Sequence, residues 1–304
     1  MRDAPAPLLG QAIADALGMP FELCGPEDPK LKDWDGQTYH SSEYHKLMPG
    51  QWSDDTMMAK LLAESLLQVG GYDPENAAKR YLGWYKSGDH RGMGTATRTA
   101  LGRLDEGKDW SESGVENAQG NGTAMRAIPL GVFFRNRLDL LVEAASLDSH
   151  ITHRSDEAEE GAIAIALAAA YLYRGLPKDE LPEAISRRLK DGPIKTGVMK
   201  CEFYLRTGGV SVGEALRVIG TKPHVVQTVP AALAAFLLSK TYLEAVQAAI
   251  RAGGDTDTTA AIAGGLAGIY YGRQAIPADL IPPLEAADAL SGLDFQLNTP
   301  AREL

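Results

Sequence analysis

Apolar residues recur with a helical period along most of this chain. The segments with this pattern cover residues 8–18, 57–67, 74–86, 97–104, 140–150, 162–173, 225–238, 242–252 and 260–271. In the first of them, Leu9, Ile13 and Leu17 follow one another at every fourth position, the spacing of a helix face. Alternating patterns typical of strands are scarce, and the sequence has no Gly/Ser linker and no repeat of fixed period. We therefore predict a single all-α domain of many helices over residues 1–304.

Composition and charge narrow the class of protein. With 44% hydrophobic and 23% charged residues, the chain has the balance of a globular domain. A net charge of −10 argues against a broad nucleic-acid surface, although a locally basic pocket could still bind a phosphorylated ligand. Residues 1–8 lack a signal-peptide pattern, and the apolar run 162–173 is too short to span a bilayer. Cys24 and Cys201 lie far apart without metal-binding spacing, so we expect a reducing, cytoplasmic location and no membrane association.

An acidic cluster stands near the C-terminal end, where Gly253-Gly254 precedes Asp255, Asp257 and Thr258. The glycines tolerate positive φ angles, which suits a tight turn. Side chains two positions apart do not share a helix face, so an irregular loop is expected to make both carboxylates converge. A buried pair of carboxylates repels unless one is protonated or a hard cation such as Mg²⁺, Mn²⁺ or Ca²⁺ lies between them. The same residues could instead cap the following helix, and the local sequence leaves both interpretations open.

A second cluster repeats this arrangement about 200 residues earlier. After Pro49-Gly50 the chain reads Ser53-Asp54-Asp55-Thr56 and then enters a predicted helix. Acids at a helix N-terminus also suit the helix dipole, so this cluster too has a purely structural interpretation. If the two clusters face each other, however, four carboxylates meet, and such a group is stable only with cations. Two divalent ions about 3.5–4 Å apart would fit.

Further polar residues lie at other helix entrances. Asn121-Gly122 is a strong turn signal, and Arg126 falls in the first turn of the next predicted helix. Arginine opposes the helix dipole there unless an anion binds nearby, so this stretch is either a phosphate cradle or an ordinary loop-to-helix junction. His153, at another helix entrance, could donate to an anionic ligand or be structural. Glu22 stands among apolar neighbours and has surface exposure as its simplest interpretation.

These motifs, in this order, resemble the ADP-ribosylglycohydrolase family, which includes the dinitrogenase-reductase-activating glycohydrolases. The resemblance covers residues 8–284. The stretches that carry it are Asp15-Ala16-Leu17-Gly18 with Glu22, Ser53-Asp54-Asp55-Thr56, Trp84, Gly94 to Leu101, Gly120 to Arg126, Thr152-His153, Gly253 to Thr258, Gly264 to Gly272, and Ile276-Pro277.

The resemblance implies a compact orthogonal multi-helix bundle with a dinuclear Mg²⁺ or Mn²⁺ centre. It implies a hydrolase of the glycosidic bond between ADP-ribose and an acceptor, either a protein side chain or a small conjugate. That reaction passes through an oxocarbenium-like transition state, which needs negative charge and an activated water. The residues carried over are Ser53, Asp54, Asp55, Asp255, Asp257 and Thr258 as metal ligands, Asp54, Asp55 and Glu22 as catalytic residues, and Asn121, Gly122, Thr123, Ala124, Met125, Arg126 and His153 as the substrate-binding group.

The chain departs from the family pattern at three positions. Ala14 stands where glycine is frequent, Ser53 where threonine is usual, and Asp156 where proline is common. Serine keeps the hydroxyl, so metal binding is expected to survive. Two other functions use the same residues: a metal-dependent phosphoryl or pyrophosphate hydrolase, and a non-catalytic ADP-ribose-binding protein. The sequence does not specify the acceptor, whose recognition is expected in loop 25–50 and around His90.

Overall fold

The computed structural model describes residues 3–299, and nearly all of its regular structure is helical. Two strands of two residues each are the exception; they pair in parallel, with Val115 opposite His153. The elements are α1 (Pro7–Gly18), η1 (Met19–Phe21), α2 (Pro29–Asp33), α3 (Asp54–Val69), α4 (Pro74–Ser87), α5 (Thr95–Asp105), α6 (Trp110–Ser113), β1 (Val115–Glu116), α7 (Ile128–Phe133), α8 (Leu138–Thr152), β2 (His153–Arg154), α9 (Asp156–Tyr173), α10 (Leu181–Ser186), α11 (Pro193–Thr207), α12 (Val212–Ile219), α13 (Val225–Leu237), α14 (Tyr242–Arg251), α15 (Thr256–Tyr271), η2 (Arg273–Ala275), η3 (Ala278–Leu280) and α16 (Ala287–Asn298).

The helical period predicts the position of most long helices, but it missed α16 and did not locate α11 individually. Local signals explain where several of the helices end. Pro74 occupies the first turn of α4, where its missing N–H costs nothing. Gly70 and Gly88 end α3 and α4 in the left-handed conformation that glycine adopts without strain. The prediction of an all-α fold is therefore confirmed.

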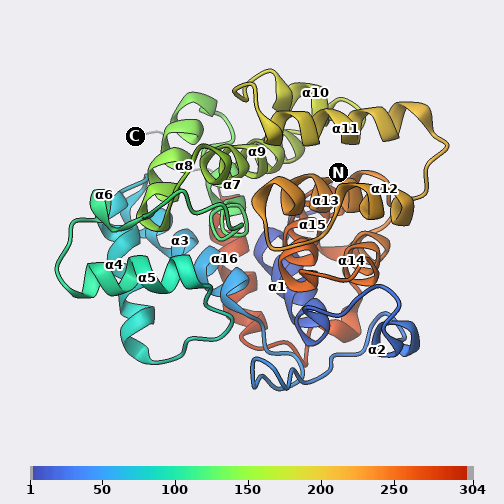
Figure 1. Ribbon diagram of the computed structural model, residues 1–304, viewed down its shortest axis with the longest axis horizontal. Helices are drawn as coiled ribbons and strands as arrows, with labels where there is room; N and C mark the ends of the chain where they lie inside the picture. Colours follow the sequence, from blue (N-terminus) through green and yellow to red (C-terminus); the bar gives the residue numbers. More distant parts are fainter. Residues whose placement is uncertain (1–2, 300–304) are drawn as a thin grey trace.

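The centre of the molecule is the contact between α1 and α15, which lie side by side in Figure 1. Glycines let the two backbones approach closely. A Cβ added to Gly264 would lie 2.4 Å from the Cβ of Ala14, and one on Gly268 would lie 2.3 Å from the carbonyl oxygen of Ala6. The predicted groove of small residues is thus filled by α1. This contact brings the C-terminal end of α1 against the first turn of α15.

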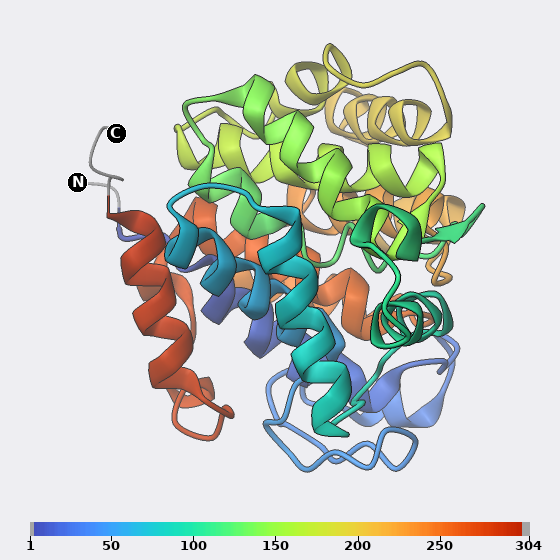
Figure 2. The same cartoon turned by 90° about the vertical axis from the view of Figure 1, so that its left-hand side faces the viewer.

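The C-terminal helix α16 lies along one edge of the molecule (Figure 2) and supplies the cap that α1 lacks. The carboxylate of Asp294 accepts hydrogen bonds from the backbone N–H groups of Leu8 and Leu9, at 2.9 and 3.1 Å. These N–H groups have no partner within their own helix, so an acid from outside satisfies them.

Two further observations concern the cysteines and the lengths of the helices. Cys24 and Cys201 are both free thiols. Within residues 3–299, the helices are all too short or too polar to cross a bilayer.

Candidate functional site

The first acidic cluster begins α3, and a residue of another helix satisfies that helix's N-terminus. Asp15 of α1 is fully buried and accepts hydrogen bonds from the backbone N–H groups of Ser53 and Thr56 and from the Thr56 hydroxyl, the last at 2.6 Å. Ser53 adds a weaker cap by accepting from the N–H of Asp55 at 3.3 Å. Because Asp15 and Ser53 satisfy the helix end, the carboxylates of Asp54 and Asp55 are free for another role.

The second cluster has the same division of roles. Asp255 occupies the N-cap position of α15, but its side chain makes no capping hydrogen bond within the described chain. Thr256 instead donates to the carbonyl oxygen of Gly18 at 2.8 Å and ties the start of α15 to the end of α1. The expectation of an irregular loop is wrong for Asp257, which lies in the first turn of α15. Convergence is still achieved, because Asp255 precedes the helix and its charge helps to raise the pKa of the Asp257 carboxyl group.

The two clusters meet in the interior. The Thr258 hydroxyl donates to Oδ2 of Asp55 at 3.3 Å, and the Ser53 hydroxyl donates to the same oxygen at 2.9 Å. The charge of Asp255 helps to raise the pKa of Asp55, and the charge of Asp55 helps to raise the pKa of Asp257. The expectation that distant helix entrances face each other is therefore confirmed.

Burial and mutual repulsion raise the pKa values of these acids. The pKa of Asp54 rises to about 7, through burial and then the charge of Asp15. The pKa of Asp55 lies well above its ordinary value for the same two reasons. The pKa of Asp257 is also raised well above the ordinary range, by burial and then by Glu22. Burial and the neighbouring carboxylates therefore disfavour the charged form of each of these three acids.

The donor set fits divalent cations. The Oδ1 atoms of Asp55 and Asp257 are buried and lack a hydrogen-bond partner among residues 3–299. A buried carboxylate oxygen without a partner destabilises the fold, so we expect a ligand at both atoms. Carboxylate and hydroxyl oxygens are the donors that Mg²⁺, Ca²⁺ and Mn²⁺ prefer.

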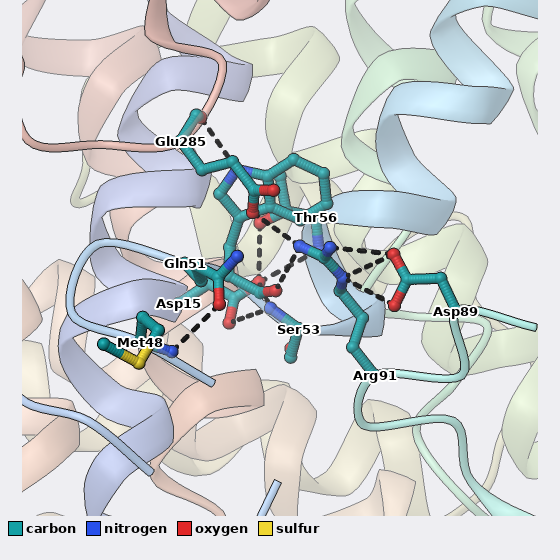
Figure 3. A network of polar contacts seen from close by, with 9 residues as sticks. Asp15, Met48, Gln51, Ser53, Thr56, Asp89, Arg91 and Glu285 are labelled. Atoms are coloured by element: carbon teal, nitrogen blue, oxygen red, sulfur yellow. Dashed lines mark hydrogen bonds and ion pairs between the residues drawn. The ribbon is translucent and has the colours of Figure 1, made fainter. Parts of the chain in front are cut away.

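A polar network holds the segment that leads into the first cluster (Figure 3). Arg91 lies between Asp89 and Glu285, and its guanidinium group covers the ring of Trp52 at 4.9 Å. This network fixes the neighbouring Gly92, whose φ of +68° requires glycine and whose added Cβ would lie 2.4 Å from Oδ1 of Asp54. The loop that precedes α5 thus packs directly on a cluster carboxylate.

Glu22 lies at the edge of the acidic centre, meaning the two facing clusters together, rather than on the open surface. It follows η1, and 18% of its side chain is exposed. Its Oε2 contacts Nε2 of His45, and both groups lie close to a carboxylate oxygen of Asp257. Sequence reasoning missed His45, because it stands in the aperiodic segment 25–50, where no pattern predicts what a side chain faces.

The 120–126 segment reaches the centre through Asn121. Its side-chain amide donates to Oδ2 of Asp255 and, at 3.0 Å, to the Thr228 hydroxyl. Gly120 and Gly122 border the His153 ring, since added Cβ atoms would lie 3.2 Å from Nε2 and 2.8 Å from Cε1. Burial, followed by the charge of Arg126, lowers the pKa of His153 to about 3. The imidazole is therefore neutral, and an anion nearby would meet a hydrogen-bond donor rather than a positive charge.

Arg126 differs from the expectation of a phosphate ligand. Its side chain is fully buried, and Nε donates to the carboxylate of Asp148 at 2.6 Å. The remaining guanidinium hydrogens bond the backbone of Asp148, the carbonyl of Gly122 and the Thr152 hydroxyl. Arg126 lies in the turn before α7, which begins at Ile128, so the prediction that it occupies a first helical turn and opposes the dipole there is wrong. The ion pair neutralises Arg126 internally, so this residue holds the 120–126 segment in place and does not present its charge to a ligand.

Three other residues of that segment also face inward. Ala124 and Met125 are buried hydrophobic residues of the core, and the Thr123 hydroxyl donates to the carbonyl of Ala158 at 2.7 Å. The side chains at these three positions are therefore not available for direct contact with a substrate. Of the predicted group, Asn121 contacts the acidic clusters directly, through Asp255. His153 lies against the neighbouring Gly120 and Gly122.

The model of one protein family, ADP-ribosylglycohydrolase, matches residues 4–301. The chain belongs to this family. It is 30% identical to the ADP-ribosylarginine hydrolase Tri1 of Pseudomonas putida (strain GB-1), over 91% of this chain and 73% of the relative. It is 29% identical to the ADP-ribosylhydrolase ARH3 of Danio rerio, over 95% of this chain and 88% of the relative. A solved structure, an ADP-ribosylglycohydrolase-related protein complex, superposes with a TM-score of 0.79 at 32% identity, covering 98% of this chain and 97% of that one. As an ADP-ribosylglycohydrolase, the protein is a hydrolase of glycosidic bonds to ADP-ribose.

Proposed function

We propose that the facing clusters hold two divalent ions, Mg²⁺ or Mn²⁺, and that the protein uses this centre to release ADP-ribose from an acceptor. The observation that carries the proposal is the junction of the clusters at Asp55, where two hydroxyls converge on one carboxylate oxygen and the other oxygen is buried and unpartnered among the described residues. The proposed ligands are Ser53, Asp54, Asp55, Asp255, Asp257 and Thr258. Two cations there would neutralise the carboxylates, polarise the ribose hydroxyls and make water more acidic.

The carboxylates also supply what the reaction itself needs. Positive charge develops at the anomeric carbon as the bond to the acceptor breaks, and a carboxylate oxygen that faces this carbon and is not bound to a cation would stabilise that charge. Asp54 or Asp55 would orient and deprotonate the attacking water, and that proton would pass on to the departing acceptor, so that the products are ADP-ribose and the free acceptor. Asp54 is the more accessible of the two, at 7% exposed against 1%. Glu22, at the solvent edge, would assist as the helper carboxylate.

The diphosphate and ribose are proposed to lie along the 120–122 backbone. Asn121 links that backbone to Asp255, so a ribose bound at the centre would carry its phosphates toward the His153 ring. Thr152 accepts from Arg126, and its hydroxyl hydrogen can then point to Nδ1 of His153 at 2.9 Å. That arrangement leaves Nε2–H to donate to a phosphate oxygen. Arg126 would thus act on the substrate only through its neighbours.

The proposed substrate is an ADP-ribosylated protein side chain or a small ADP-ribose conjugate. The names of the relatives support this class, since one is an ADP-ribosylarginine hydrolase. We further propose a cytoplasmic location, which the two free thiols support.

Product analysis tests the proposed function. Peptides ADP-ribosylated on arginine or on serine, and ADP-ribose conjugates of small molecules, would be incubated with the protein and Mg²⁺, Mn²⁺ or EDTA. We expect intact ADP-ribose from at least one substrate, at least about a hundredfold less with EDTA, and recovery when either metal is restored. AMP as the product would instead identify a pyrophosphate hydrolase. Tight ADP-ribose binding without turnover at any metal concentration would identify a binding protein.

A further inference from the structure

One imidazole stands at the edge of the otherwise all-oxygen centre. A ring nitrogen of His45 and carboxylate oxygens of Glu22 and Asp257 all lie within 4.8 Å of one another, and Nε2 is the nitrogen that contacts Glu22. These residues come from three separate parts of the chain: the segment between α2 and α3, the end of η1, and the first turn of α15. Three potential ligands from distant segments have therefore been brought together by the fold.

The backbone around His45 positions its ring. Ser42 and Leu47 form an antiparallel bridge, with N–H···O distances of 2.9 and 3.1 Å in the two directions. The Ser42 hydroxyl also accepts from the N–H of His45 at 3.2 Å, and Lys46 turns the chain with a φ of +55°. The ring packs edge-on against Tyr44 and is only 11% exposed. His45 is thus held on a closed turn that faces the centre.

A second, independent observation points to a cation at this position. Asp257 is only 4% exposed, and its buried Oδ1 lacks a hydrogen-bond partner among residues 3–299. Its carboxylate belongs to the same group as the imidazole of His45. A neutral imidazole alone would leave that group with an excess of negative charge. A cation held by the three side chains would balance this charge and would give the Asp257 carboxylate the ligand that it lacks.

We propose that His45 donates Nε2 to a divalent ion held with Glu22 and Asp257, and that this nitrogen biases the centre toward a first-row transition ion over Mg²⁺. Mg²⁺ strongly prefers oxygen ligands in near-ideal octahedral geometry. Imidazole suits transition ions, and affinities for a mixed nitrogen and oxygen site increase from Mn²⁺ through Fe²⁺ to Co²⁺. The inference rests on the proposed metal centre and adds to it a ligand and a metal preference.

Pulsed electron paramagnetic resonance of Mn²⁺ tests the ligand directly. Metal-depleted protein would be loaded with one and two equivalents of Mn²⁺, and ¹⁴N modulation from a coordinated imidazole would be measured. The wild type is expected to show this modulation, and His45→Gln is expected to lose it. His40→Gln, which changes an exposed histidine of the same loop outside the group, is the matched control and should keep it.

The metal preference is measured by calorimetric titration of the same proteins. We expect the ratio of the Mg²⁺ to the Mn²⁺ dissociation constant to fall by about tenfold or more in His45→Gln and to stay unchanged in His40→Gln. His45→Phe, which keeps a ring at this position, serves if the glutamine variant has a lowered melting temperature.

Three outcomes separate this inference from the function on which it rests. Two bound Mn²⁺ ions without ¹⁴N modulation in the wild type, together with ADP-ribose release, would overturn the inference and keep the metal centre; His45 would then serve only as the ion-pair partner of Glu22. Modulation that persists in His45→Gln would also overturn it. Failure of the wild type to bind Mn²⁺ at all would overturn both.

Discussion

Replacing Asp55 with asparagine is expected to lower the rate of ADP-ribose release by about a thousandfold or more, which corresponds to about 4 kcal/mol of lost transition-state stabilisation. Asp55 joins the two clusters, because the hydroxyls of Ser53 and Thr258 both converge on its Oδ2. An amide keeps an oxygen for those hydroxyls but removes the negative charge that cations require. We therefore expect weaker metal binding together with the loss of turnover.

The same substitution is expected to raise the melting temperature of the metal-free protein. The raised pKa of Asp55 arises from burial and from repulsion by neighbouring acids, so the carboxylate opposes folding when no cation is bound. Asparagine removes that repulsion. Thermal denaturation in EDTA and steady-state kinetics with Mn²⁺ would be measured on one preparation. We expect the melting temperature to rise and the turnover rate to fall.

A buried acid elsewhere provides the control for Asp55. Asp294 is also buried, its pKa is raised to about 7 by burial, and it caps the N-terminal end of α1, whereas the clusters contact the C-terminal end of that helix. Asp294→Asn should keep turnover per folded molecule. If Asp55→Asn retained wild-type kinetics, the assignment of Asp55 to the centre would be wrong.

Replacing Arg126 with methionine is expected to destabilise the fold by about 3–5 kcal/mol. The substitution leaves the carboxylate of Asp148 buried without its cation, although the hydroxyls of Tyr72 and Tyr81 still donate to it at 3.3 and 3.0 Å. It also releases the carbonyl of Gly122 and the Thr152 hydroxyl from their donors. For a domain of this length the melting temperature should fall by about 6 °C or more.

Denaturant unfolding of a small set of variants would test this prediction. Adding Asp148→Asn to Arg126→Met should recover part of the loss, because the double variant no longer buries an unpaired charge. Arg135→Met is the matched control. Arg126 covers the ring of Tyr81 at 5.0 Å, and Arg135 covers that of Tyr173 at 4.5 Å, but Arg135 is partly exposed and donates to backbone carbonyls. Its loss should cost about 1 kcal/mol or less. Equal effects at the two arginines would refute a special role for the buried ion pair.

The fold and both acidic clusters were accessible from sequence because they depend on local rules. Helical period locates most of the long helices, although not α16, and the spacing of Gly264 and Gly268 predicts a close helix contact. Local rules do not show which distant residue a given side chain contacts. Asp15 caps α3 from a different helix, so no capping preference near Ser53 could separate a structural from a metal-binding role for the acids that follow.

Two side chains show why the rest needed three-dimensional information. Arg126 has the local position of an anion ligand, yet Asp148, 22 residues later, neutralises it. His45 stands in a segment without period, and its neighbours in space are fixed by the bridge between Ser42 and Leu47 and by the approach of α15. Long-range pairing of charges and the path of an aperiodic loop are both invisible to sequence periodicity.

The central claim is that two distant helix entrances form one dinuclear metal centre. Anomalous diffraction from crystals of the protein grown with Mn²⁺ tests it most directly. We predict two anomalous peaks about 3.5–4 Å apart, between the carboxylates of Asp55 and Asp257. Mn²⁺ density elsewhere on the molecule, with none in contact with either carboxylate, would contradict it.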